Sequence, residues 1–282
     1  MIENHIKTII LLGALTGILL WVGSLWGQQG LIFAVIFAVV INFGSYFYSD
    51  KLVLAMYHAK PVTEHQEPKL YNIVKRVAEK ADIPMPKVYI VPSESPNAFA
   101  TGRNPKNAVV ACTKGIMGLL DEKELEGVIA HEISHIKNRD ILIATIAATI
   151  AGVISFVAMM ARWGALFGGF GGRGRDGGRG AEIIVLAILT PIIAMIIQLA
   201  ISRSREYLAD ASAAKTLNDS SGLASALKKL SSNVNHNPMR IGNKTTASLF
   251  IVNPFSAKGL MGLFSTHPPM DERVKKLDGM QF

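Results

Sequence analysis

The 282-residue sequence contains a single cysteine, Cys112, and three long stretches without any aspartate, glutamate, lysine or arginine. One cysteine excludes an internal disulfide and suits a reducing compartment. The uncharged stretches are residues 8–49, 141–161 and 183–202, which together contain 83 residues. The other 199 residues carry all 50 charges, and this fraction of 25% is usual for soluble protein. The composition therefore excludes a wholly soluble globule, a disordered chain and a protein that is only membrane.

The uncharged stretches have the length of membrane spans, because the apolar core of a bilayer needs about 20 residues of helix. Residues 8–49 fit two spans separated by the polar run Gly-Gln-Gln-Gly at 27–30, which predicts a helical hairpin with a short turn there. Buried core helices of a soluble protein are the alternative, but 42 uncharged residues exceed an ordinary core helix. Residues 141–161 and 183–202 predict two further spans, or else a hairpin that lies in or under the membrane.

The distribution of lysine and arginine predicts the orientation. Lys7 precedes the first pair of spans and Lys51 follows it, whereas the turn between them has no cation. By the positive-inside rule, the N-terminus and the sequence from Lys51 to the next span are cytosolic. Residues 162–182 contain four arginines and two acidic residues, which is contrary to that rule if both later segments cross.

The formal net charge of +8 bears on the partners of the protein. Excess cations beside membrane spans suit anionic lipid headgroups. No motif for nucleic-acid recognition accompanies the charge. We therefore expect the lipid bilayer as a partner and no nucleic acid.

A short motif at residues 131–135, His-Glu-Ile-Ser-His, lies on a predicted helix that begins at Asp121, with Glu124 completing a capping box. Two histidines at i and i+4 project from one helical face and can reach one metal ion. Glu132, next to them, can act as the general base of a metalloprotease. Surface histidines with a solvated glutamate are the alternative, but apolar residues on both sides of the motif favour a protected site.

A catalytic zinc ion has a third protein ligand and an open position for water. Residues 202–210 follow the last uncharged stretch and place Glu206 and Asp210 one helical turn apart. Glu206 can supply the ligand oxygen, and Asp210 can accept a hydrogen bond from a ligand histidine. A solvated helix end among arginines is the alternative. If Glu206 meets the histidines, the two intervening hydrophobic segments must either both cross the membrane or both fail to cross it.

Three motifs in this order carry a resemblance to a known family. They are residues 131–140, residues 202–210 and the run Ser-Thr-His-Pro-Pro at 265–269, which Arg273 follows. With them, the chain resembles the HtpX-type bacterial membrane metalloproteases, which are relatives of the CAAX prenyl endopeptidases and the mitochondrial Oma-type proteases. The resemblance extends over almost the whole chain.

The resemblance implies roles for individual residues. One zinc ion per subunit would be bound by His131, His135 and Glu206, with Glu132 as general base and Asp210 supporting a ligand histidine. His267 matches the histidine that stabilises the oxyanion, although its surroundings alone suggest a loop residue. Asn97, Ala98 and Phe99 resemble the edge strand on which such proteases lay the substrate backbone by β-addition.

We therefore expect an α+β, mostly helical, integral membrane metalloprotease of the zincin type, with a small sheet and about four transmembrane helices. Its expected parts are an N-terminal hairpin (1–50), a cytosolic catalytic region (51–140), a second hydrophobic pair with a Gly/Arg-rich loop (141–202) and a second cytosolic catalytic region (203–282). Predicted helices of the soluble part include 70–81, 222–235 and 271–277, and predicted strands are 87–91, 97–101 and 107–112.

The expected function is zinc-dependent hydrolysis of peptide bonds in damaged or misassembled membrane proteins under heat or envelope stress. The resemblance places the protein in a bacterial inner membrane, with its active site in the cytosol and membrane proteins as its substrates. One alternative is a non-enzymatic membrane scaffold or sensor in which zinc only ties the two parts of the site together. Another is the processing of prenylated C-termini.

Overall fold

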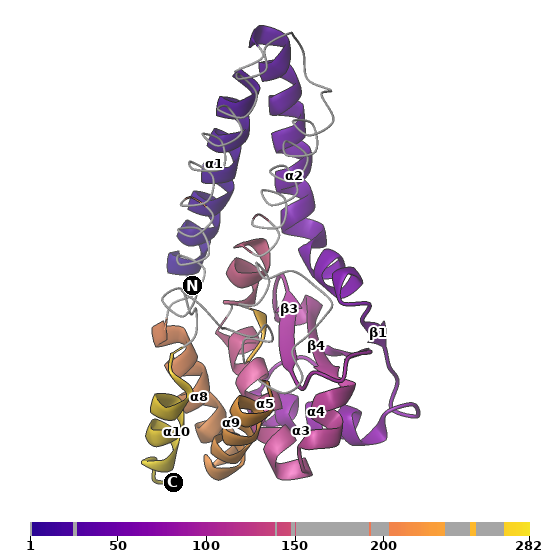
Figure 1. Ribbon diagram of the computed structural model, residues 1–282, viewed down its shortest axis with the longest axis vertical. Helices are drawn as coiled ribbons and strands as arrows, with labels where there is room; N and C mark the ends of the chain where they lie inside the picture. Colours follow the sequence, from indigo (N-terminus) through magenta and orange to yellow (C-terminus); the bar gives the residue numbers. More distant parts are fainter. Residues whose placement is uncertain are drawn as a thin grey trace, which may run out of the picture.

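The structure is a computed structural model, and it describes residues 2–24, 27–138, 140–147, 150, 192, 203–234, 249–251 and 268–282. A long helical hairpin extends from one end of the molecule, and a sheet with the remaining helices forms the other end (Figure 1). The helices are α1 (Ile2–Ser24), α2 (Gly27–Met56), α3 (Pro68–Ala81), α4 (Lys114–Leu119), α5 (Glu122–Lys137), α8 (Arg203–Leu217), α9 (Ser221–Val234) and α10 (Met270–Asp278). The strands are β1 (Lys60–Pro61), β2 (Lys87–Val91), β3 (Ala98–Gly102) and β4 (Ala108–Thr113), and a 3-10 turn (Pro105–Asn107) precedes β4.

The hairpin of α1 and α2 was predicted, but residues 27–30, which were expected to form its turn, belong to α2. The sequence put the turn at residues 27–30, whereas α2 already begins at Gly27, whose φ is +70°. The two helices pack closely at Gly23: a Cβ on Gly23 would collide with the Gly30 carbonyl and with the side chain of Ala34. Small residues at such contacts let two membrane helices approach closely.

The two helices of the hairpin also share one polar contact. The Asn42 side chain donates a hydrogen bond to the Thr16 hydroxyl at 2.6 Å, and Thr16 in turn donates to the Leu12 carbonyl at 2.9 Å. Large apolar side chains on α2 face outward instead, with Phe33 73% and Val39 64% exposed. An apolar exterior with a polar contact inside is the pattern of helices that pack in lipid.

The expectation of about four spans is met only in part. Within the described residues, one helical segment is long and apolar enough to cross a membrane, Gly27–Tyr48, with a mean hydropathy of 2.1. The apolar part of α1, Ile9–Trp21, is shorter. Most of residues 141–202 lies outside the described residues. Where the third stretch is described, Ile143 and Ile146 pack against Leu11 and Leu15 of α1.

The sheet has the strand order β1-β2-β4-β3. β2 and β4 are parallel, whereas β1 pairs antiparallel with β2, and β3 pairs antiparallel with β4. β3 is therefore an edge strand. Gly102 at its end has a φ of +131°, and a Cβ there would collide with the Asn107 carbonyl, so only glycine fits this turn.

Both faces of the sheet are buried, which explains why β4 reads as a continuous apolar run. Val110 and Cys112 point into the main core, together with side chains from α3, α5, α8 and α9. Val109 and Ala111 point to the other face, where Tyr57 at the end of α2 packs. Cys112 lies in β4, as the predicted strand 107–112 implies, and none of its surface is exposed.

The soluble helices follow the sequence pattern closely. The capping box of α5 is present, because Asp121 accepts the Glu124 backbone N–H at 2.9 Å and Glu124 accepts the Asp121 N–H at 3.0 Å. α9 crosses α5 at two glycines: a Cβ on Gly127 would meet the Leu223 nitrogen at 2.5 Å, and a Cβ on Gly222 the Lys123 carbonyl oxygen at 2.6 Å. Both halves of the soluble sequence thus contribute to one core.

Candidate active site

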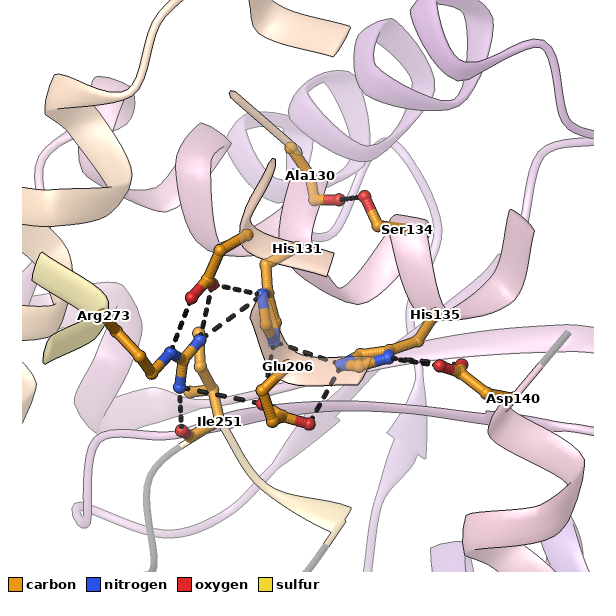
Figure 2. Close-up of polar contacts among 9 residues, drawn as sticks. Ala130, His131, Ser134, His135, Asp140, Glu206, Ile251 and Arg273 are labelled. Carbon is orange, nitrogen blue, oxygen red and sulfur yellow. Dashed lines mark hydrogen bonds and ion pairs between the residues drawn. The ribbon is translucent and has the colours of Figure 1, made fainter. Parts of the chain in front are cut away.

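The buried centre of the molecule brings together two parts of the chain that 70 residues separate. His131 and His135 come from the last two turns of α5, and Glu206 comes from the first turn of α8. One ligand atom of each residue lies within 4.8 Å of the others. The Nε2 atoms of the two histidines are 3.1 Å apart, and each lies 3.6 to 3.7 Å from a Glu206 oxygen (Figure 2).

The outer ring nitrogen of each histidine faces a carboxylate. Nδ1 of His131 is 2.9 Å from an oxygen of Asp210, and Nδ1 of His135 is 3.1 Å from an oxygen of Asp140. A carboxylate can only accept a hydrogen bond, so it holds the proton on Nδ1. With its proton on Nδ1, each ring can present the lone pair of Nε2 to a metal ion at the centre of the site.

This donor set fits a zinc ion. Two imidazole nitrogens and one carboxylate are the ligands of one class of catalytic zinc site, and carboxylates behind the histidines are typical of such sites. The electrostatics of the site agree. Burial lowers the pKa of His135, but the Asp140 carboxylate outweighs it and raises the pKa to about 10. Burial also opposes charge on His131, yet Asp210 raises its pKa above the usual value. The site thus favours a positive charge, which a metal ion supplies.

Glu132 lies beside the histidines and is 2% exposed. Burial raises the pKa of its carboxyl group to about 7, against the opposing effect of the two histidines. The backbone N–H of Ala100 in β3 donates a hydrogen bond to this carboxyl group. The acid is therefore held between the helix that carries the histidines and the edge of the sheet.

Arg273 of α10 completes the buried network. Its guanidinium group donates to both oxygens of Asp210, at 2.8 and 2.7 Å, and to the Ile251 carbonyl at 3.2 Å (Figure 2). Burial raises the pKa of Asp210, but Arg273 lowers it more strongly, to about 2. Asp210 is thus ionised at neutral pH and can accept the hydrogen bond from the His131 Nδ1–H.

The other predicted site residues are placed as follows. Asn97 is fully buried directly before β3, where its backbone N–H donates to the Thr113 hydroxyl at 2.9 Å. Ala98 and Phe99 are the first residues of β3 and are fully buried. His267 lies outside the described residues.

Asp140 and Arg273 were given no role from the sequence. Asp140 follows the motif by five residues, and the rule that a ligand histidine has a carboxylate behind it could have found it as the nearest acid after His135. Arg273 was noted only as the arginine that follows the third motif, and its role could not be inferred because it reaches the site from another helix, 63 residues beyond Asp210.

The site has two ring nitrogens and a carboxylate around a centre that favours a cation, with a buried acid beside them. The same chain carries an apolar helical hairpin. These features together define a membrane metalloprotease. The family model of Peptidase family M48 matches residues 64–281, and the chain belongs to this family. The resemblance to HtpX-type proteases is thereby confirmed, and a non-enzymatic scaffold or sensor is not favoured.

Relatives of known sequence extend over nearly the whole chain. A Protease HtpX homolog from Syntrophobacter fumaroxidans is 51% identical over 282 residues, covering 98% of this chain and 99% of its own. Another from Desulfatibacillum aliphaticivorans is 55% identical over 278 residues, covering 98% of this chain and 89% of its own. A third, from Thermococcus kodakarensis, is 51% identical over 273 residues, with 96% and 94% covered.

The crystal structure of S. mikatae Ste24p has a similar fold. The TM-score is 0.53 at 19% sequence identity, and the match covers 98% of this chain and 66% of that chain. This likeness concerns the fold alone. It agrees with the expectation of a mostly helical protein with a small sheet.

Proposed function

We propose that the protein is a zinc-dependent endopeptidase in which His131, His135 and Glu206 hold one zinc ion and Glu132 is the general base. The observation that carries the proposal is the pairing of each histidine with a carboxylate, since it directs both Nε2 lone pairs toward Glu206. Bound zinc supplies Lewis acidity, which activates water as the nucleophile and polarises the peptide carbonyl.

Glu132 has the place and surroundings that proton transfer requires. It accepts the proton of the attacking water and then delivers it to the leaving amine. The Ala100 N–H orients its carboxyl group, and the burial of the site excludes bulk water. Asp140 and Asp210 keep the ligand histidines in one tautomer throughout.

The edge strand β3 is the proposed binding surface for the substrate backbone. In its antiparallel pairing with β4, Asn97 and Phe99 direct their backbone groups toward β4, whereas those of Ala98 and Ala100 point outward. The Ala98 carbonyl accepts the Ile251 N–H at 3.3 Å, and the Ala100 N–H binds Glu132. A substrate strand adds here by displacing the Ile251 N–H from the Ala98 carbonyl, while the Ala100 N–H keeps its contact with Glu132. We propose His267 as the donor that stabilises the oxyanion.

We further propose that the active site faces the cytosol of a bacterium, with substrates among damaged or misassembled proteins of its inner membrane. The division into 1–50, 51–140, 141–202 and 203–282 belongs to this proposal, with residues 141–202 forming two further spans. The continuity of α2 supports it, because the helix runs from its apolar span Gly27–Tyr48 to Met56, and the next residue, Tyr57, packs against Phe99 of β3. The substrate edge then lies within about 15 Å of the membrane surface.

The topology has its own test. Arg175 lies in the loop between the two later hydrophobic stretches, outside the described residues. In an Arg175→Cys variant that also carries Cys112→Ala, an impermeant thiol reagent should label the protein from outside intact cells. Labelling from the cytosolic side alone would contradict four spans.

The catalytic proposal is tested with Glu132→Gln. This variant should retain zinc, because no ligand changes, but should lose nearly all cleavage of an unfolded membrane protein. Glu126→Gln is the matched control: it lies on the same helix, its side chain pairs with Arg76 and Lys80 instead, and its activity should be close to that of the unchanged protein. If Glu132→Gln keeps zinc and cleaves at the normal rate, the proposed mechanism is wrong.

A further inference from the structure

Among the residues that the structure describes, Arg273 is the one arginine that is fully buried. No part of its side chain is exposed, although it lies in α10, the last helix of the chain. Burying a guanidinium group is costly unless its donors and charge are matched by the surroundings. The contacts of the guanidinium group therefore indicate the role of this buried charge.

One side of the guanidinium group acts on the zinc-ligand helices. Nε and Nη2 bind the two oxygens of Asp210 at 2.8 and 2.7 Å, a bidentate arrangement that fixes the plane of the carboxylate. The same Asp210 oxygen that meets Nη2 also lies 2.9 Å from Nδ1 of His131. The orientation of the His131 ring thus depends on Asp210, and that of Asp210 depends on Arg273.

The other side acts on the edge of the sheet. Nη1 donates to the Ile251 carbonyl at 3.2 Å, and the Ile251 N–H donates to the Ala98 carbonyl of β3 at 3.3 Å. Phe250, next to Ile251, packs edge-on against Phe99 of β3 at 5.1 Å between ring centroids. A single side chain therefore joins a metal-ligand histidine to the segment that lies against the outer edge of β3.

We propose that Arg273 is a positioning residue of the active site, which sets the orientation of His131 through Asp210 and the place of residues 249–251 along β3. This inference rests on the proposed function, because it assumes zinc at His131 and substrate at β3. A purely structural role would require only that the buried charges be paired. A positioning role requires the guanidinium group to bind both oxygens of Asp210 and the Ile251 carbonyl at the same time.

Arg273→Lys separates these two roles, because lysine keeps the charge but cannot bind two carboxylate oxygens and a carbonyl at once. We expect the full-length protein in detergent to bind zinc about 10 to 100 times more weakly, as measured by competition with a chelator. We also expect KM for a peptide substrate to change, because residues 249–251, which the substrate displaces from β3, are no longer held in place, and we expect kcat to fall. Arg76→Lys is the matched control, since Arg76 pairs with two glutamates of α5 away from the site, and it should leave both quantities unchanged.

A double mutant tests whether the effect passes through Asp210 and keeps the inference testable should Arg273→Lys fail to fold. Arg273→Gln with Asp210→Asn replaces the ion pair by two amides that can still pair. Its zinc affinity should match that of Asp210→Asn alone within about twofold, because residues acting through one contact are not additive. Normal zinc affinity and KM in Arg273→Lys, or fully additive losses in the double mutant, would overturn the inference. A wild-type protein that binds no zinc would instead overturn the proposed function.

Discussion

Nδ1 of His135 lies 3.1 Å from a carboxylate oxygen of Asp140, a residue that begins the stretch leading into the next apolar segment. The contact fixes the second ligand histidine in the same way as Asp210 fixes the first. Asp140 is 5% exposed, so this contact is sheltered from water. Helix α5 and the start of the third hydrophobic stretch are thus joined at the proposed metal site.

Replacing Asp140 with asparagine should weaken zinc binding by about 10 to 100-fold, because the amide no longer holds the proton on Nδ1 by charge. Chelator competition on the purified protein measures the change. Asp82→Asn serves as the control, since Asp82 is exposed at the end of α3, and it should bind zinc normally. Equal affinities in the two variants would show that Asp140 does not support the ligand.

The close crossing of α5 and α9 predicts a steric effect. Gly127→Ala should destabilise the protein by about 1 to 3 kcal/mol, because its Cβ would meet the Leu223 backbone at 2.5 Å. Gly118→Ala in α4 has no neighbour within 4 Å and should stabilise by about 0.5 to 1 kcal/mol. Thermal unfolding of the zinc-free proteins in detergent distinguishes them, and a loss of stability in both variants would contradict the packing described here.

The pairing of Glu124 predicts a specific loss of stability in acid. Burial raises the pKa of Glu124, but Lys229 at 2.7 Å and Ser225 at 2.6 Å outweigh it and lower the pKa below its usual value of 4.5. A lowered folded pKa means that the stabilisation is present at neutral pH and disappears as the pH falls through the folded pKa.

Unfolding of the zinc-free protein at decreasing pH checks this effect. Glu124→Gln should be less stable at neutral pH and should lose less stability on acidification than the unchanged protein. Glu79→Gln, at an exposed position of α3, should follow the unchanged protein. An acid slope that Glu124→Gln leaves intact would assign the loss to other groups.

Cys112 should be inert in the folded protein. It is fully buried in β4, and burial raises the pKa of its thiol, so little thiolate is available for reaction. We expect no alkylation under native conditions and complete alkylation after denaturation, as measured by mass spectrometry. Fast native labelling would show that β4 does not lie between two covered faces.

The soluble fold and much of the site could be predicted because local chemistry decides them. The capping box at Asp121 and Glu124 sets the start of α5, and the alternation in β2 and the apolar run of β4 give these strands to within about one residue. The i, i+4 spacing of His131 and His135 places both on one helical face. These features need no knowledge of distant parts of the chain.

The features that the sequence did not predict depend on contacts between distant segments. Gly30 looks like a turn residue, but it lies inside α2, and its carbonyl packs so closely against Gly23 of α1 that a Cβ on Gly23 would collide with it. Arg273 looks like a surface residue of a short helix, since its partners Asp210 and Ile251 become neighbours only after folding. The sequence around each of these residues has no periodic pattern that would reveal its contact with a distant segment.

The central claim is that His131, His135 and Glu206 hold one catalytic zinc ion. X-ray absorption at the zinc edge of the full-length protein, purified in detergent with one equivalent of zinc, tests it most directly. The account predicts two imidazole rings and oxygen ligands at about 2.0 to 2.2 Å, and the loss of one of the two imidazole rings in His131→Ala. A sulfur ligand at about 2.3 Å, or an imidazole signal that His131→Ala leaves unchanged, would contradict it.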